Sequence, residues 1–351
     1  MASAAAPNVD ITIDGTEVPD EDFISYVVER DMNQPDMATV VLSNQDSAYM
    51  DKTKIGAQIE IKVSKDQEPE TVSIFQGEIL GVEPSYKGKD TTKILIRAVN
   101  KMHRLMRKRK SMTFADKSDQ QILDQVVKDA GLSLEWKHEK SITYKHVYQH
   151  NLNGLEFVRM RAARMGCHVW CVGNKIMVKE PDLSSDSGIE YSVDKGGTLR
   201  SFTPRMNSTA VLNKVSVKGW NPEKKELITG EATVSSSPLG GTTAVSASSD
   251  IGGNEESFTV DHPIWSKEEA DAIAKARLRD LNLQFITGEA EVAGNAELEL
   301  GTVVTIKASE AKSNPFNGKY FVMGITHRHT LPKGKDGGFV SVLKLARDAH
   351  E

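Results

Sequence analysis

The hydrophobic period of this chain changes twice. Up to residue 100, apolar and polar residues mostly alternate, which is the period of half-buried strands. Gly77 and Gly81 interrupt one long apolar run, and glycines inside a strand are typical of bulges or sharp bends. Small barrels contain such bends. The pattern therefore predicts a first β-barrel domain over residues 9–100, after a disordered N-terminus at residues 1–8.

A helical period replaces the alternation after residue 100. Asn153 and Glu156 have the spacing of a capping box, apolar residues including Val158 and Ala162 follow at helical spacing, and Gly166 is a suitable C-terminal residue. An alternating hairpin comes next. We therefore predict a mixed α/β connector domain over residues 101–190, organised around this helix. Three arginines are assigned to the polar side of the helix: Arg159, Arg161 and Arg164.

Alternation returns after a polar linker around Pro181 to Asp194 and predicts a second β-barrel domain over residues 195–351. Residues 235–256 are rich in Ser, Gly, Thr and Ala and are expected to form a flexible loop that is too poor in large apolar groups to pack. One more helix should start at Ser266. The predicted fold class is α+β, mainly β: two similar small β-barrel domains joined by a mixed α/β connector.

Two segments, one in each predicted barrel, have similar sequences. Each starts with a glycine before an alternating strand, at Gly56 and at Gly301. Each continues with Phe-x-Gly, which aligns Gly77 with Gly318. Chance similarity between two antiparallel meanders is one explanation, and the use of one barrel type twice is the other. The second explanation predicts internal pseudo-symmetry. Both segments also contain the turn Lys-Gly-Lys-Asp, at residues 87–90 and 333–336.

Composition and charge exclude several classes of protein. The net charge of the 351 residues is −5, so no overall basic surface points to a specific nucleic-acid partner. No run of 18 apolar residues occurs, so no membrane span is expected. The first residues lack the basic and apolar regions of a signal peptide, which predicts synthesis in the cytoplasm. The two cysteines fit that reducing compartment.

The sequence contains no recognisable catalytic motif. His327 and His329 alternate on a predicted strand, where they are either a metal pair across a symmetry axis or two surface histidines of a barrel. Cys167 and Cys171 would be roughly 13 Å apart on a strand, too far for a disulfide. A second pair of metal ligands is missing beside them. We therefore expect no catalytic residues, no bound cofactor and no metal site.

Two further features have a structural and a binding interpretation. A basic run after residue 103 either contacts phosphate or forms a solvated face or a subunit contact to an acidic partner. Interleaved aromatic residues, which single-strand binding needs, are absent from it, so the second interpretation is preferred. Trp220 is interpreted as a core residue at a strand end rather than a ligand platform. The basic run consists of Arg104, Arg107, Lys108, Arg109 and Lys110.

Four stretches carry a resemblance to a known family. In order, they are FQGEILGVE, SMTFADKSDQQILDQVVKDAGL, YQHNLNGLEFVRMRAARMGCHVW, and LRSFTPRM followed by VSVKGWNPEKK. Their order and spacing resemble phage late control protein D, the baseplate hub of contractile tails. They also resemble the N-terminal hub part of the VgrG spike proteins of type VI secretion, and related hubs occur in extracellular injection particles. The resemblance covers most of residues 10–347.

The resemblance implies a structural, non-enzymatic hub in a phage tail or a phage-tail-like injection particle. It implies a homotrimer whose six barrels join a hexameric tail tube protein to a trimeric spike, next to other baseplate proteins. Because the sequence ends soon after LKLARDAHE, unlike full-length VgrG, the spike is expected to be a separate protein.

Two other functions remain as alternatives. A tail-associated cell-wall hydrolase would need convergent carboxylates or a metal site, and neither is recognisable in the sequence. A glycan-binding tail module would favour exposed aromatic residues, and the chain has only four Trp in 351 residues.

Overall fold

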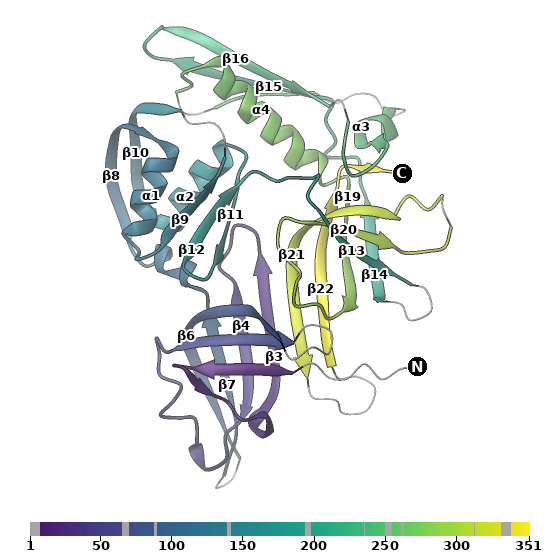
Figure 1. Cartoon of the computed structure of the whole chain (residues 1–351). Helices are drawn as coiled ribbons and strands as arrows, with labels where there is room; N and C mark the ends of the chain where they lie inside the picture. Colours follow the sequence, from purple (N-terminus) through teal and green to yellow (C-terminus); the bar gives the residue numbers. More distant parts are fainter. Residues whose placement is uncertain are drawn as a thin grey trace.

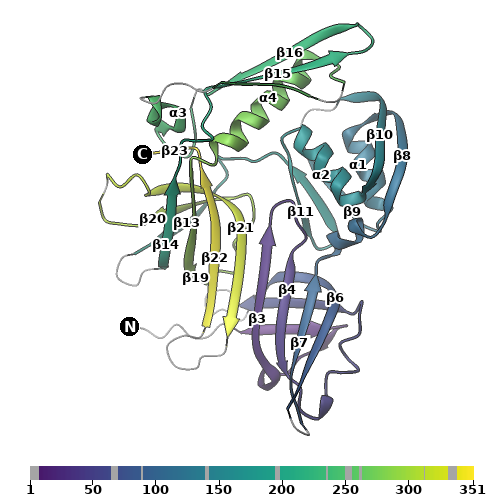
Figure 2. The same ribbon diagram turned by 180° about the vertical axis from the view of Figure 1, so that it is seen from behind.

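The computed structural model of the chain consists mainly of strands, with few helices, which confirms the predicted fold class. Two β regions lie side by side, and a connector and an insert with a long helix cover one end of them (Figures 1 and 2). The backbone amide of Asn8, the last residue of the predicted disordered N-terminus, donates to Ser64 Oγ at 2.9 Å. Residues 1–7 lie outside the described residues. The structure describes residues 8–64, 70–87, 90–138, 142–193, 198–234, 236–249, 255–260, 263–311, 313–330 and 338–351.

The first β region packs its alternating apolar residues into one core, in which Val28, Val40 and Ile96 are fully buried. Its sixth strand bends at Glu78: the residues before this point pair with β5, and those after it pair with β7. The predicted bend near Gly77 is therefore confirmed. The strands are β1 (Val9–Ile13), β2 (Thr16–Glu17), β3 (Phe23–Asp31), β4 (Met37–Ser43), β5 (Gln58–Ser64), β6 (Thr71–Lys87) and β7 (Asp90–Val99), with the short 3-10 helices η1 (Asp20–Asp22) and η2 (Gln45–Ser47).

The second β region has its own core, which includes Ala290, Tyr320 and Leu343. Its first strand lies in the stretch predicted to be a polar linker. That prediction is wrong for residues 186–192, because β13 pairs in parallel with β20 and buries Tyr191. The strands are β13 (Asp186–Ser192), β14 (Leu199–Met206), β19 (Ile286–Ala293), β20 (Val303–Lys307), β21 (Gly318–Thr330), β22 (Gly338–Arg347) and β23 (Ala349–His350).

One continuous sheet joins the two β regions. Strand β3 of the first region pairs antiparallel with β21 of the second, from Ser25 opposite Thr330 to Asp31 opposite Gly324. The strand order is β14-β19-β22-β21-β3-β4-β7-β6-β5-β1-β2, with β20 paired to β21. The two strands run next to each other in both views (Figures 1 and 2). Because the sheet crosses from one region to the other, the domain limits at residues 100, 190 and 195 stay predictions.

The connector has a third core around its two helices. Helix α2 is capped as predicted: Asn153 Oδ1 accepts from the amide of Glu156 at 2.8 Å, and the Glu156 carboxylate accepts from the amide of Asn153 at 3.0 Å. Val158 and Ala162 are fully buried. The elements are η3 (Lys101–Met106), β8 (Arg109–Ser118), α1 (Asp119–Lys128), β9 (Ser133–Lys137), β10 (Thr143–Asn153), α2 (Gly154–Arg164), β11 (His168–Val172) and β12 (Lys175–Lys179).

An insert separates β14 from β19. Helix α4 (Lys267–Asn282) packs on a small sheet of β15 (Lys214–Asn221), β16 (Glu226–Thr233) and β18 (Glu255–Thr259), around a fourth core. Ser266 caps the helix as predicted and accepts from the amide of Glu269 at 3.2 Å. The carboxylate of Glu269 accepts from the amide of Trp265 instead of that of Ser266, so the capping box is not reciprocal.

The predicted loop at residues 235–256 packs over much of its length. Strand β17 (Thr242–Thr243) pairs with β23, helix α3 (Ala244–Ala247) follows, and Leu239 is 2% exposed in the core of the second β region. The expectation that this segment cannot pack is therefore wrong for residues 236–249. A few small or apolar residues are sufficient here because they enter a core that other strands already form.

The two β regions repeat one five-stranded unit. Strands β3, β4, β7, β6 and β5 have the same order and pairing as β14, β19, β22, β21 and β20. Two register shifts also occur at equivalent positions in the two units. The first strand of each unit has a register shift, between Phe23 and Ser25 or between Leu199 and Ser201. The fourth strand of the order, β6 or β21, has another, between Ile79 and Gly81 or between Val322 and Gly324. Shared bulges at equivalent points exclude chance similarity of two meanders.

The equivalence confirms one predicted glycine pair and corrects the other. Gly56 and Gly301 both have positive φ, 92° and 78°. Their amides donate to the carbonyl oxygens of Ile79 and Val322, at 2.8 and 3.0 Å, so these positions match.

Counting along β6 and β21 from this match pairs Gly81 with Gly324. Gly77 and Gly318 are not equivalent. Gly77 lies opposite Ile59 on β5, which corresponds to Val304 on β20. Gly318 lies opposite Ile306, two residues beyond Val304. The prediction failed because the Phe-x-Gly motif recurs out of register. Most of the two Lys-Gly-Lys-Asp turns lies outside the described residues.

Candidate functional site

The two repeated units are joined along one pair of strands. We use "seam" for the pairing of residues 25–31 of β3 with residues 324–330 of β21. Lys344, on the neighbouring strand β22, donates to both carboxylate oxygens of Asp31, at 2.9 and 2.8 Å. The amide of Met32 donates to the carbonyl of Met323 at 3.2 Å. Backbone pairing plus an ion pair at one end holds the two units together.

The buried face of the seam contains the two histidines singled out in the sequence. Neither is a surface residue: His327 is fully buried and His329 is 3% exposed. His329 faces Tyr26 across the seam, with ring centroids 5.8 Å apart, and His327 Nδ1 lies 2.9 Å from Ser341 Oγ. Burial lowers the pKa of His327 to about 3, so the ring is neutral at pH 7. The two histidines are therefore neutral core residues, and neither the metal-pair nor the surface-pair interpretation describes them.

Two strands of the repeated units have a free edge. Among the described strands, β14 pairs only with β19, and the part of β6 after Glu78 pairs only with β7. The equivalent edges, those of β3 and β21, are the ones joined in the seam. Tyr86, on the free part of β6, is 62% exposed, and Met206 at the end of β14 is 38% exposed. Unpaired edges of this kind are sites for adding another strand.

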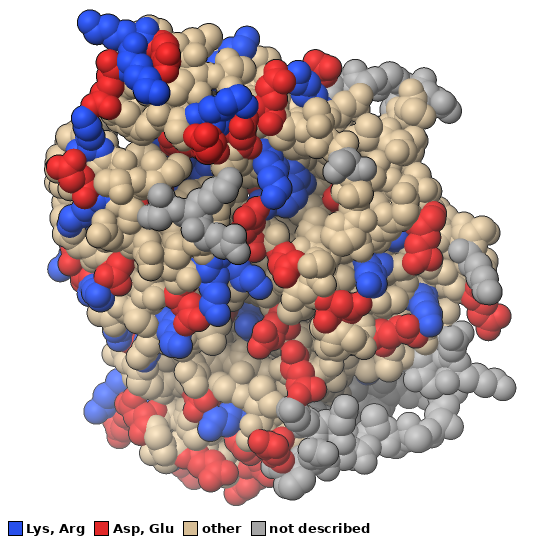
Figure 3. All heavy atoms as spheres, turned by 45° about the horizontal axis from the view of Figure 1, so that its top comes forward, with Lys and Arg blue, Asp and Glu red and all other residues tan. Residues whose placement is uncertain are grey.

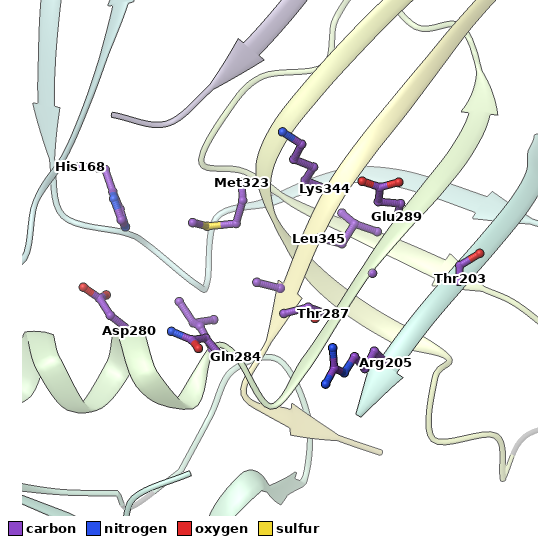
Figure 4. A pocket seen from close by; sticks show the side chains of 13 residues that line it. His168, Thr203, Arg205, Asp280, Gln284, Thr287, Glu289, Met323, Lys344 and Leu345 are labelled. Atoms are coloured by element: carbon purple, nitrogen blue, oxygen red, sulfur yellow. The ribbon is translucent and has the colours of Figure 1, made fainter. Parts of the chain in front are cut away.

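A hollow that reaches β14 has a volume of about 670 Å³. Thr203, Arg205, Glu289 and Lys344 line it from the polar face of the sheet, and the end of α4 and His168 of the connector overhang it (Figure 4). Opposite charges are mixed on its walls, and no nucleophile with an adjacent base is among the residues that line it. It lies between the sheet of the second unit, the end of α4 and the connector.

The basic run contacts acidic residues of the same chain. The Arg104 guanidinium and His103 hold Glu78 at the bend of β6, and Arg104 keeps the pKa of Glu78 at about 2. Glu78 was not singled out from the sequence, although its place beside Gly77 marks the bend. Lysines and arginines are interspersed with acidic residues over the face in Figure 3. Two more members are paired as well: Arg109 with Glu156 and Lys110 with Asp129, both at 2.8 Å.

Helix α2 joins the connector to the insert. Arg161, predicted on the polar side of α2, is 3% exposed and lies 2.5 Å from Asp119; Arg164 lies 2.5 Å from Glu269 of α4. The prediction failed for Arg161 because a buried carboxylate of α1 pairs with it. Both guanidinium groups stack on the ring of Tyr144. The two ion pairs link α1, α2 and α4.

The remaining candidates are structural or exposed. Cys167 and Cys171 are buried free thiols, as predicted, and burial raises the pKa of both to about 12. Trp220 is 52% exposed, so its prediction as a core residue is wrong: it lies on the outer face of β15 opposite Leu227. Within the described residues, no group of three His, Cys, Asp or Glu could hold a metal, and no helix is long and apolar enough to span a membrane.

Solved structures share this fold at low sequence identity. The 43 kDa tail protein of prophage MuSo2 from Shewanella oneidensis is 13% identical, with a TM-score of 0.73 over 99% of this chain and 100% of that one. A tail protein from Neisseria meningitidis is 12% identical, with a TM-score of 0.72 over 98% and 97%. A type VI secretion component of Escherichia coli is 12% identical, with a TM-score of 0.63 over 95% and 76%.

The Escherichia coli component is itself structurally similar to tail proteins of bacteriophage T4. These likenesses establish that the chain has the fold of tail and type VI proteins. No curated protein matches the chain in sequence. One family model does match, the Alg8 N-terminal domain, over residues 3–330. The match spans nearly the whole chain and both repeated units, so the chain belongs to the Alg8 N-terminal domain family.

Proposed function

We propose that the chain is the structural central hub of a contractile injection machine and has no enzymatic activity. In this proposal it forms a homotrimer that seats a hexameric tail tube protein on one side and a separate trimeric spike on the other. Other baseplate proteins surround it. The observation that carries the proposal is the five-stranded unit repeated within one sheet, with bulges at equivalent positions.

The repeat gives the geometric reason. Three copies of a chain with two equivalent units present six similar surfaces. A six-fold partner can contact all six alike, although the trimer itself has only three-fold symmetry. The connector and the insert occur once per chain (Figure 1), so they suit contacts that repeat three times, such as those to a trimeric spike. A symmetry adaptor needs both kinds of surface.

The joints between the parts suit a protein that transmits force. The two units are linked by backbone pairing over seven residues of each strand and by the Lys344–Asp31 ion pair. The connector is linked to the insert by the buried pair Arg164–Glu269, and the buried pair Arg161–Asp119 links α2 to α1 within the connector. Breaking a buried ion pair by removing one partner typically destabilises a protein by about 3–5 kcal/mol. Such joints favour rigid transmission over hinge motion.

The purified chain tests this proposal, alone and mixed with the tube and spike proteins of the same system. Mass photometry should show a mass of three chains, at least when the partners are present. Negative-stain images should then show a three-fold ring at one end of tube assemblies. A species that stays at the mass of one chain with both partners present would contradict the proposal.

A further inference from the structure

The repeated units show how a second copy of the chain would bind. We infer that the free edge of β14 pairs antiparallel with residues 81–87 of β6 from another copy, in the register of the seam. This inference rests on the proposed trimer and specifies its contact. Identical copies of the chain occupy both free edges. Each copy pairs through β14 with one neighbouring copy and through β6 with the other.

Strand order gives the first argument. Within the chain, the fourth strand of the second unit's order, β21, pairs with the first strand of the first unit, β3. The equivalent strands with free edges are β6 and β14. One free edge therefore belongs to a strand equivalent to β21 and the other to a strand equivalent to β3. The same pairing can add the next copy. A contact between two different surfaces of identical chains generates a ring when the rotation closes.

The seam fixes the register of this contact between copies. Within the chain, Thr326 lies opposite Glu29, His329 opposite Tyr26, and Gly324 opposite Asp31. Replacing each of these residues by the equivalent residue of the other unit gives three facing pairs between copies. They are Glu83 opposite Arg205, Tyr86 opposite Phe202, and Gly81 opposite Asn207.

The facing side chains are complementary in this register. Glu83 carries a negative charge and Arg205 a positive one, and both are exposed on the single chain. Tyr86 is 62% exposed, and an aromatic partner in Phe202 would cover it as Tyr26 covers His329 in the seam. Cross-strand aromatic and opposite-charge pairs each add roughly 0.2–1 kcal/mol. Glu83 already accepts from Arg97 at 2.7 Å, so Arg205 would extend an existing pair.

Gly81 gives an independent argument. At the equivalent Gly324, a Cβ would clash with the Asp31 carboxylate of the facing strand. At Gly81, the nearest atom to a Cβ is Arg97 Cβ at 3.5 Å, an ordinary contact, so nothing in the single chain requires glycine there. A facing strand from another copy would supply the close neighbour that the single chain lacks.

Two prolines show how this contact differs from the seam. Pro84 and Pro204 lie opposite each other in the inferred register, where the seam has His327 and Val28. Proline lacks the N–H that a ladder needs and is typical of edge strands. The contact between copies therefore has fewer hydrogen bonds than the seam and is weaker. The same prolines protect the single chain from indiscriminate edge pairing.

Cysteine cross-linking tests the register. In the double variant Glu83→Cys with Arg205→Cys, the two thiols of facing copies lie directly opposite each other, close enough to oxidise. Three such bonds close a ring, so non-reducing gels should show a band of three chains. The native Cys167 and Cys171 are buried and do not compete. The double variant Thr326→Cys with Glu29→Cys is the internal control, because its bond forms within one chain and leaves the mass unchanged.

An out-of-register pair and a charge exchange complete the test. Ser85→Cys with Arg205→Cys should cross-link at most one tenth as much as the facing pair. Glu83→Arg and Arg205→Glu should each weaken association at least tenfold in a dilution series, and the two together should restore it.

The outcomes separate this inference from the proposed function. A trimer by mass photometry in which the facing pair cross-links no better than the shifted pair overturns the register and leaves the hub. Cross-linked chains that do not close at three support the register and contradict the trimer. The absence of intermolecular bonds at both pairs, while the internal control oxidises, overturns the inference.

Discussion

The two repeated units share five strands and two bulges, yet they differ at the corner between their first two strands. In the first unit, β3 passes to β4 through residues 32–36. In the second unit, the whole insert occupies the same corner, and the amide of Asn207 closes its base by donating to Phe285 at 2.8 Å. A strand corner can take so large an addition because the two ends of the insert lie next to each other. The strands and the bulges, in contrast, must keep their register.

The units also differ in how their equivalent edges are used. In the seam, the joint lies within one chain and buries His327 and His329. At the free edge, the equivalent residues of β6 are Pro84 and Tyr86. One edge is thus permanently joined by the chain, and the other is suited to weaker joining between copies. The two units thus share the register of their strands, but they differ in the side chains on their edge strands.

The largest expected effects come from the two misaligned glycines. Gly77→Val would place Cβ 2.6 Å from both Phe75 Cζ and Val99 O, and Gly318→Val would force a side chain at φ +121° against the Arg347 guanidinium. Each should destabilise by about 3 kcal/mol or more through overpacking and, at Gly318, backbone strain. Urea unfolding measures this. Equal stability of either variant and the wild type would show that the bends tolerate side chains.

These glycines also show what the sequence could predict. Alternation and capping residues identified most strands and the long helices α2 and α4, because local period and local hydrogen bonds determine them. The seam could not be predicted, since it depends on which distant strands meet. Glu78, Asp31 and Lys344 look like ordinary surface charges until the fold brings them to a bend or a seam. Strand β8 was missed because it shows little apolar alternation.

The next largest effect is expected at Arg347, which distinguishes the second unit from the first. Its guanidinium is fully buried, donates to the carbonyl oxygens of Asn317 and Leu239 at 2.6 and 3.1 Å, and stacks on Tyr320. The register puts Asn100 at the equivalent place in the first unit. Arg347→Met should destabilise by about 2–4 kcal/mol, because buried carbonyls lose their donors. A melting temperature within one degree of the wild type would contradict this role.

Acid should weaken the seam between about pH 6.5 and 4.5. His327 has a folded pKa of about 3, below its unfolded value of about 6.5, so the unfolded chain binds the proton first and stability falls as the pH drops. The loss approaches about 1.4 kcal/mol per pH unit for one histidine. Glu78, with a pKa of about 2, contributes a loss only below about pH 4.5.

The matched variant His327→Asn isolates that effect. It can keep a hydrogen bond to Ser341 and cannot titrate, so its unfolding free energy should vary less between pH 4.5 and 6.5. Identical pH slopes for the variant and the wild type would assign the effect to other groups.

The smallest effects give the sharpest comparison of equivalent positions. Gly324→Ala should destabilise the chain by about 1–2 kcal/mol, because the Asp31 carboxylate must move. Gly81→Ala should change the stability of the single chain by less than about 0.5 kcal/mol. In the inferred ring, however, Gly81→Ala should weaken association. An alanine that is neutral at Gly324, or costly at Gly81 in the monomer, would break the equivalence.

The most direct measurement is an electron cryo-microscopy map of the chain bound to its tube partner, reconstructed with no symmetry imposed. We expect three copies in a ring, with the six repeated units at one radius and about 60° apart, and with β14 of each copy beside β6 of the next. A ring in which the two units of a chain lie at different radii, or in which β14 faces solvent, would contradict the proposed symmetry adaptor.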